Sequence, residues 1–118
     1  VIDIRSLIPL DKETNIDHFY FPTTLFLNRS LIPLDKEAIF ESVKKTSKAL
    51  VVHEDKVFSG FGAELAAMIG EEMFRYLDGP VQRVGSTFTP VGFNPILEKE
   101  ILPDEAKIYE AARKLLEY

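Results

Sequence analysis

Three consecutive polar residues, His53, Glu54 and Asp55, are the first candidates for chemistry in this chain. A histidine beside two carboxylates can transfer protons or bind a metal ion. A helical H-E-x-x-H zinc site would need a second histidine where the chain has Val57. A histidine without catalytic partners more often has a structural role. We therefore predict that His53 caps an element or forms a hydrogen bond to another domain.

A glycine loop after these residues is a second candidate site. Ser59, Gly60, Phe61 and Gly62 precede a stretch with helical spacing, and free N–H groups at a helix N-terminus bind anions such as phosphate. The two glycines allow either positive φ or a close approach to another chain. Because the loop lacks the lysine and the full glycine spacing of a P-loop, we favour a structural turn that lets Phe61 pack.

Strands and helices alternate around these candidates. The apolar run at 50–52 predicts a buried strand that ends at His53, and an apolar stripe predicts a helix from Gly62 to Leu77. This alternation predicts an α/β sandwich with a largely parallel sheet. The other predicted elements are a helix at 36–47 with Asp35 as its N-cap, a strand at 81–84, a turn-rich stretch at 85–94 and a last helix that starts at 103–104.

The composition is typical of one globular domain. The chain has 118 residues, of which 46% are hydrophobic and 28% are charged, so it can bury a core and is not expected to be disordered. The net charge of −5 and the scattered lysines and arginines argue against a nucleic-acid partner. The absence of cysteine excludes disulfides, and no apolar run approaches the roughly 20 residues of a membrane helix. Because the sequence starts at Val1 rather than Met, we expect a fragment.

The N-terminal third contains an exact repeat. The segment from Arg5 to Glu13 recurs unchanged from Arg29 to Glu37. Two partial copies are too few for a solenoid, so we interpret the repeat as a duplicated or inserted segment around 13–36 within a single domain that spans 1–118. We favour the second copy for the native turn into the helix, with a strand at 23–28 and residues 1–8 as an additional or competing strand. An exposed second copy would also invite homodimer formation or strand exchange.

Five motifs in order along the chain carry a resemblance to one family. They lie at 3–11, 50–55, 60–64, 77–84 and 102–105. Together they resemble the C-terminal domain of the β part of the E1 component of thiamine-diphosphate-dependent 2-oxo-acid dehydrogenases, such as pyruvate dehydrogenase and branched-chain 2-oxoisovalerate dehydrogenase. The resemblance implies a three-layer α/β/α sandwich with a mixed, mostly parallel sheet, as in the C-terminal domain of transketolase.

The resemblance also implies where the coenzyme binds. The family holds thiamine diphosphate and Mg²⁺ through a Gly-Asp-Gly segment, whereas the nearest match here, Asp78-Gly79-Pro80, lacks the first glycine. We therefore expect no coenzyme, no metal and no catalytic residue in this domain, and no activity of the domain alone. The whole enzyme would decarboxylate a 2-oxo acid oxidatively and transfer the acyl group to the lipoyl arm of the E2 component.

Two kinds of partner follow from the resemblance. Other E1 domains and subunits would contact the strand end and glycine loop, at a channel or interdomain surface formed by His53, Glu54, Gly60, Phe61 and Gly62. In relatives, an acidic residue precedes the small residue and proline of the turn at 79–80. With the terminal carboxylate, that residue faces the basic peripheral subunit-binding domain of the E2 acyltransferase.

Carried over to this chain, the E2 contacts fall on Asp78 and on the carboxylate of Tyr118, which would pair with an arginine or lysine. The alternative is a solvated helix end. One loop departs from the family, because Phe88 stands where relatives often have an aspartate, and its geometry is not transferred.

Two other functions stay open at this point. The chain could be the C-terminal domain of a transketolase or a deoxyxylulose-phosphate synthase, or an independent small-anion-binding module that uses the Gly60–Gly62 loop. The motifs at 31–35, 77–80 and 102–105 favour the dehydrogenase. We expect the protein in the cytoplasm, or in the mitochondrial matrix of a eukaryote.

Overall fold

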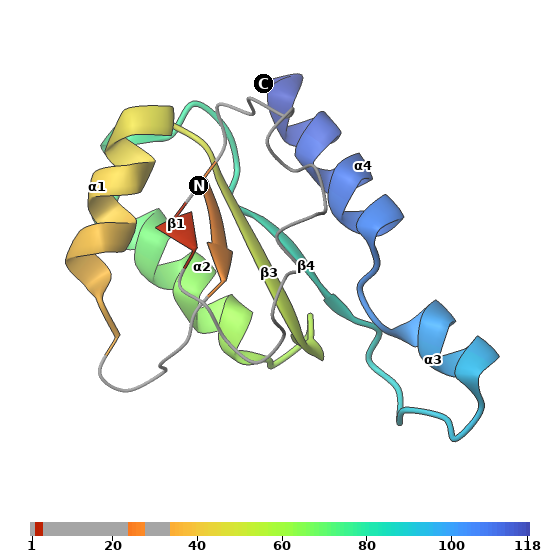
Figure 1. Ribbon diagram of the computed structural model, residues 1–118. Helices are drawn as coiled ribbons and strands as arrows, with labels where there is room; N and C mark the ends of the chain where they lie inside the picture. Colours follow the sequence, from red (N-terminus) through yellow and green to blue (C-terminus); the bar gives the residue numbers. More distant parts are fainter. Residues whose placement is uncertain (1, 4–23, 28–33) are drawn as a thin grey trace.

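The structure, a computed structural model, describes residues 2–3, 24–27 and 34–118 (Figure 1). Four strands in this part form one sheet, and helices cover both of its faces. The elements in chain order are β1 (Ile2–Asp3), β2 (Thr24–Leu27), α1 (Lys36–Thr46), β3 (Ala49–Lys56), α2 (Phe61–Glu72), the 3₁₀ helix η2 (Phe74–Tyr76), β4 (Gln82–Ser86), α3 (Pro95–Ile101) and α4 (Glu105–Leu116).

The strands lie side by side in the order β1-β2-β3-β4, and all three described pairs are parallel. Parallel neighbours joined through a helix take right-handed crossovers, so the helices that follow β2 and β3 cover the same face. Figure 1 shows α1 and α2 on one side of the sheet and α4 on the other. The predicted α/β/α sandwich with a mostly parallel sheet is confirmed.

Each face of the sheet has its own core, because side chains alternate along β3. Ala49 and Val51 face α1 and α2, whereas Leu50 and Val52 face α4. The first core consists of Ile39, Val43, Ala49, Val51, Leu65, Ile69 and Met73. The second core consists of Leu50, Val84, Ala112 and Leu115. β3 is thus the central strand of the domain and fixes the positions of both helical layers.

The predicted N-cap Asp35 is confirmed, and the last helix begins after Asp104, at the predicted place. The Asp35 carboxylate accepts a hydrogen bond from the Ala38 amide at 3.0 Å, and Asp104 accepts one from the Lys107 amide at 2.8 Å. Since Asp35 belongs to the second copy of the repeat, this copy provides the turn into α1, as predicted. β2 matches the strand predicted at 23–28, and β1 is an additional strand beside it. The first copy, from Arg5 to Glu13, and the insertion up to residue 23 lie outside the described residues.

Three element boundaries differ from the prediction. β3 does not end at His53 but continues to Lys56, and β4 covers Gln82–Ser86 rather than 81–84. The second helix ends at Glu72, and η2 then leads to Leu77.

α3 was not predicted, because none of its residues is buried and no apolar stripe marks it. Local signals are present, since Asn94 caps the Ile96 amide at 2.9 Å and Pro95 occupies the first turn. No helix among the described residues is long and apolar enough to cross a bilayer.

Candidate functional site

The polar cluster His53-Glu54-Asp55 forms a bulge at the carboxyl end of β3. Val52 pairs with Val84 and Lys56 pairs with Ser86, so the three residues lie opposite Gly85 alone. A bulge bends a strand and redirects its side chains, and such irregularities are common next to functional sites. The bulge explains why β3 continues through polar residues to Lys56, although the apolar pattern predicted its end at His53.

Three glycines surround the His53 ring, and we call Gly60, Gly62 and Gly85 the glycine cradle. A Cβ atom on Gly60 would lie 2.9 Å from His53 Cε1, and one on Gly85 would lie 2.9 Å from Nε2. A Cβ atom on Gly62 would overlap with the ring itself. The sequence therefore brings together a loop glycine, a helix glycine and a strand glycine to make room for one imidazole.

The His53 ring has no hydrogen-bond partner among the residues that the structure describes, although Nδ1 and Nε2 are both buried. Burial lowers the pKa of His53, Asp55 acts in the opposite direction, and Arg83 lowers the pKa further. The lowered pKa favours the neutral ring, whose one N–H donor is buried and has no acceptor in the described part of the chain. An unsatisfied buried donor costs about 1–3 kcal/mol.

Asp55 occupies the place where the loop could have held an anion. Its carboxylate accepts a hydrogen bond from the Lys56 amide at 2.7 Å, and this bond lowers the pKa of Asp55. The Phe61 amide, in the first turn of α2, lowers the pKa further. A carboxylate of the chain itself therefore faces the N-terminus of α2, which argues against phosphate binding by this loop.

The two glycines of this loop allow close approach rather than positive φ. Gly60 has a φ of −79°, and its Cβ would overlap with the carbonyl oxygen of Lys56. The left-handed residue in the loop is Ser59, with a φ of 60°. Phe61 packs against the first core, which agrees with the predicted structural turn.

Two side chains of β4 form hydrogen bonds to main-chain carbonyls of the bulge and of the following loop. The buried Ser86 hydroxyl donates to the carbonyl of Glu54, and the Arg83 guanidinium donates to the carbonyl of Val57 at 2.9 Å. The Glu54 side chain itself is exposed. Of the predicted channel residues, His53, Gly60 and Gly62 therefore meet in one cluster, whereas Glu54 faces solvent beside it.

The two predicted docking residues, Asp78 and Tyr118, lie at the opposite end of the sheet, where Gly79 packs against Tyr118. The Asp78 amide donates to the carbonyl of Ser47 at 2.8 Å, and a Cβ atom on Gly79 would lie 3.0 Å from Tyr118 Cβ. Asp78 and Tyr118 are both exposed. A shallow hollow of about 330 Å³ adjoins them, lined by Gln82, Lys114, Glu117 and Tyr118.

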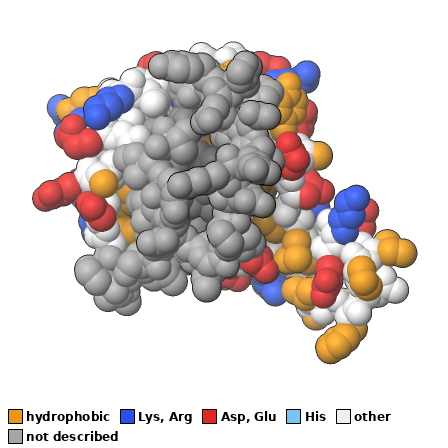
Figure 2. All heavy atoms as spheres, in the orientation of Figure 1, with side chains coloured by type: hydrophobic (Ala, Val, Ile, Leu, Met, Phe, Trp, Pro, Cys, Tyr) orange, Lys and Arg blue, Asp and Glu red, His pale blue; other side chains and the backbone are white. Residues whose placement is uncertain are grey.

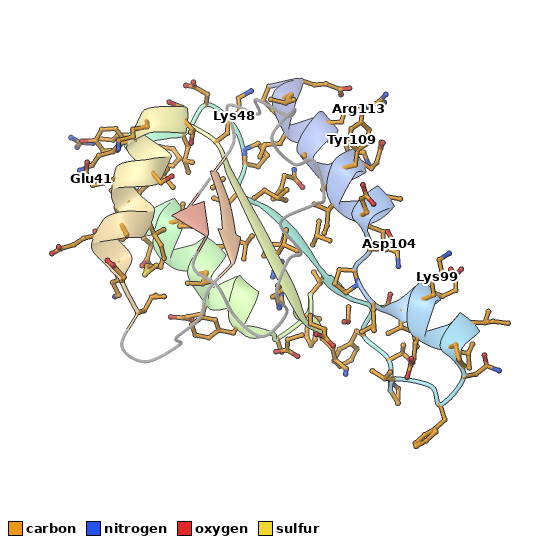
Figure 3. All side chains as sticks on the ribbon, in the orientation of Figure 1. Glu41, Lys48, Lys99, Asp104, Tyr109 and Arg113 are labelled. Carbon is orange, nitrogen blue, oxygen red and sulfur yellow. The ribbon has the colours of Figure 1, made fainter. Side chains whose placement is uncertain are left out.

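Lys48 ties this end of the sheet to α4. Its ammonium donates to the carbonyl of Leu115 at 3.1 Å, and Figure 3 shows Lys48 between α1 and the last turn of α4. The last turn of α4 is thereby fixed against the start of β3. Tyr118 thus follows an anchored helix end.

An exposed apolar surface, which the sequence reasoning missed, lies on the segment 87–101, here called the α3 arm. Figure 1 shows α3 beyond the start of α4 and away from the sheet, and Figure 2 shows hydrophobic side chains gathered there. The side chains of Phe88 and Ile96 are 66% and 73% exposed. Phe88 stacks edge-on against Phe58, with ring centroids 4.9 Å apart. A run of large apolar residues inside a turn-rich stretch was the available signal.

Lys107 of α4 anchors the α3 arm. Its ammonium donates to the carbonyls of Lys99, Glu100 and Leu102 at 3.2, 2.9 and 2.6 Å, so it caps the C-terminus of α3. The Thr87 amide donates to the carbonyl of Ile101 at 3.0 Å. Figure 3 shows Asp104 at the junction of α3 and α4. The arm has no buried core of its own and is held by these hydrogen bonds to its main-chain carbonyls and by the Phe58–Phe88 contact.

The described residues contain no group of three or more His, Asp or Glu side chains that could hold a metal ion. The fold is a parallel α/β/α sandwich domain, with the glycine cradle at one end of its sheet and the exposed residues Asp78 and Tyr118 at the other. Residues 24–108 match the family described as "Transketolase, C-terminal domain". The chain belongs to this family, and the predicted family is confirmed.

Its relatives are named as E1 β subunits of 2-oxo-acid dehydrogenases, among others. The chain is 41% identical over 118 residues to the pyruvate dehydrogenase E1 component subunit beta of Rickettsia felis, covering 100% of this chain and 29% of the relative. It is 43% identical over 118 residues to the mitochondrial 2-oxoisovalerate dehydrogenase subunit beta 2 of Arabidopsis thaliana, covering 100% and 26%. It is 38% identical over 116 residues to the acetoin:2,6-dichlorophenolindophenol oxidoreductase subunit beta of Bacillus subtilis, covering 98% and 27%. The chain thus spans less than a third of the length of these curated relatives.

Proposed function

We propose that this chain is the C-terminal domain of the E1 β part of a 2-oxo-acid dehydrogenase, where it serves subunit assembly and docking of the E2 acyltransferase. The parent enzyme would carry out oxidative decarboxylation of a 2-oxo acid and acyl transfer to lipoyl-E2. Thiamine diphosphate and Mg²⁺ would be held by other parts of that enzyme. The names of the relatives support this assignment, and two of them include the word mitochondrial, which fits a mitochondrial matrix location in a eukaryote and a cytoplasmic one in a bacterium.

The docking role depends on one observation, the packing of Gly79, the neighbour of Asp78, against Tyr118. This packing brings two segments that are distant in sequence together near the amino ends of β3 and β4. The hydrogen bond from the Asp78 amide to Ser47 fixes the backbone that carries the exposed carboxylate. A carboxylate on a fixed backbone suits an arginine or lysine of a basic partner domain, because the main chain does not have to become ordered on binding.

Binding to the isolated peripheral subunit-binding domain of E2 tests this role. A charge-assisted hydrogen bond contributes about 1.5–3 kcal/mol, so Asp78→Asn should weaken binding by roughly 10- to 150-fold and reduce its salt dependence. Glu98→Gln, on the α3 arm, removes the same charge far from Asp78 and should leave the affinity unchanged. Equal affinity of the Asp78→Asn variant and the unmodified chain would remove Asp78 from the docking site.

The assembly role depends on the α3 arm. Its exposed apolar side chains form a contiguous surface of the kind that marks protein–protein contacts. We assign this surface to contacts with other E1 domains or subunits. An independent anion-binding module is disfavoured, since Asp55 already faces the N-terminus of α2.

A further inference from the structure

The environment of His53 accommodates a neutral ring and opposes a charged one. Protonation would give the ring a second N–H donor, and neither ring nitrogen has an acceptor among the described residues. The glycine cradle lies directly against the ring, because a single Cβ at any of its three positions would clash with the ring or its strand. A buried cation without partners is far more costly than a buried neutral group.

The charged groups around His53 come from three elements. β3 contributes Glu54, Asp55 and Lys56, of which Asp55 attracts an imidazolium. β4 contributes Arg83, which repels one. α2 contributes its N-terminus, whose dipole is positive, with Glu64 exposed in the first turn. The carboxylate that acts on the ring is that of Asp55, which is exposed.

We propose that His53 is a proton-operated latch: protonation expels the imidazole from the glycine cradle toward Asp55 and releases the β3 bulge and the loop at 57–62. The loop follows because Gly60 and Gly62 rest directly against the ring and against the Lys56 carbonyl. Phe58 lies within this loop and stacks on Phe88, so release alters the apolar surface at the base of the α3 arm. The latch thus connects pH with the shape of a contact surface.

NMR spectroscopy of the whole chain tests the latch. The chain has two histidines, so the His53 resonances are assigned by their loss in His53→Phe and the remaining ones belong to His18. We expect His53 to titrate below its ordinary pKa of 6.5, and the amide signals of 57–62 to shift together with His53. An unchanged loop through the His53 titration would overturn the proposal.

Two glycine variants of α2 make the test specific. Gly62→Ala places a methyl group in the position of the ring, so its loop signals at neutral pH should resemble those of the unmodified chain at low pH, and His53 should titrate near the ordinary value. Gly70→Ala is the matched control, because a Cβ there meets no atom within 4 Å. Its loop should titrate like that of the unmodified chain.

His53→Phe provides a second test of the latch if Gly62→Ala does not fold. Phenylalanine fills the cradle with a ring that cannot be protonated, so the loop signals of this variant should stay in their neutral-pH positions throughout the titration. A pH-dependent shift of the same loop in His53→Phe would show that another group controls it, and the latch would be rejected.

Discussion

Removal of the Lys107 ammonium should detach the α3 arm without unfolding the domain. Lys107→Met keeps the apolar stem but loses the three hydrogen bonds to carbonyls at the end of α3. α3 has seven residues and buries none of them, so these bonds and the Thr87–Ile101 bond are its main anchors. No residue of the arm belongs to either core, so the effect should stay local.

The magnitude follows from the geometry of Lys107. A hydrogen bond from a charged donor contributes about 1.5–3 kcal/mol when it is protected from water. The Lys107 side chain is 39% exposed, so water competes with the three acceptors, and we expect about 1–3 kcal/mol for the group as a whole. Because about 1.4 kcal/mol corresponds to a tenfold change, the arm should open roughly 5- to 150-fold more often.

Hydrogen exchange of the α3 amides measures this opening directly. Exchange in 95–101 should accelerate by the stated factor, whereas the urea midpoint of the whole chain should change little. Lys114→Met, a cation in the last turn of the same helix, removes the same charge and should not affect α3. The reasoning would be refuted if α3 exchanged at its original rate, or if the whole domain lost stability instead.

Three further predictions concern pH, packing and assembly. The pKa of His53 is lowered in the folded chain, so the unfolded chain binds more protons once the pH falls below the ordinary value of 6.5. The free energy of unfolding should therefore decrease below this pH. Urea unfolding should show this decrease, and the His53→Phe variant should show a smaller one. Gly70→Ala should stabilise the chain by about 0.5–1 kcal/mol in the same assay, because alanine loses less backbone entropy than glycine in a helix and its Cβ meets no atom within 4 Å; destabilisation would contradict the open space around Gly70. Phe93→Ser, at a fully exposed position, should leave the thermal midpoint unchanged but weaken co-purification with other E1 subunits; unaltered assembly would exclude this part of the arm.

Local signals in the sequence predicted most of the fold. Asp35 was identified as a helix cap because its side chain precedes apolar periodicity, and it forms the expected bond. The start of the last helix at 103–104 was also predicted, and Asp104 caps it. The strand boundary at His53 was wrong because an apolar run reports burial, whereas β3 continues past its buried part through a bulge. Bulges depend on the partner strand, here on Gly85, and the pattern of one strand does not contain that information.

The candidate site was only partly predictable for the same reason. The sequence indicated that Gly60 and Gly62 permit close approach, but it did not show that both approach His53 or that Gly85 completes the cradle. These contacts join three elements and are fixed by tertiary packing. The assignment of Asp78 and Tyr118 to one docking surface came from the family resemblance and stays a prediction; the structure places Gly79, the neighbour of Asp78, against Tyr118.

The latch and the docking residues should act independently, because they lie at opposite ends of β3. At about 3.3 Å per residue, the strand separates Ala49 from Asp55 by about 20 Å, which exceeds the Debye length of about 8 Å at physiological salt. The strand between them is buried on both faces and has little freedom to transmit a small displacement. Gly62→Ala should therefore leave E2 binding unchanged, Asp78→Asn should leave the His53 titration unchanged, and the double variant should show additive effects within about 0.5 kcal/mol. A larger coupling energy would mean that the sheet transmits the release of the bulge to the docking end, and the two surfaces would then form one regulated unit.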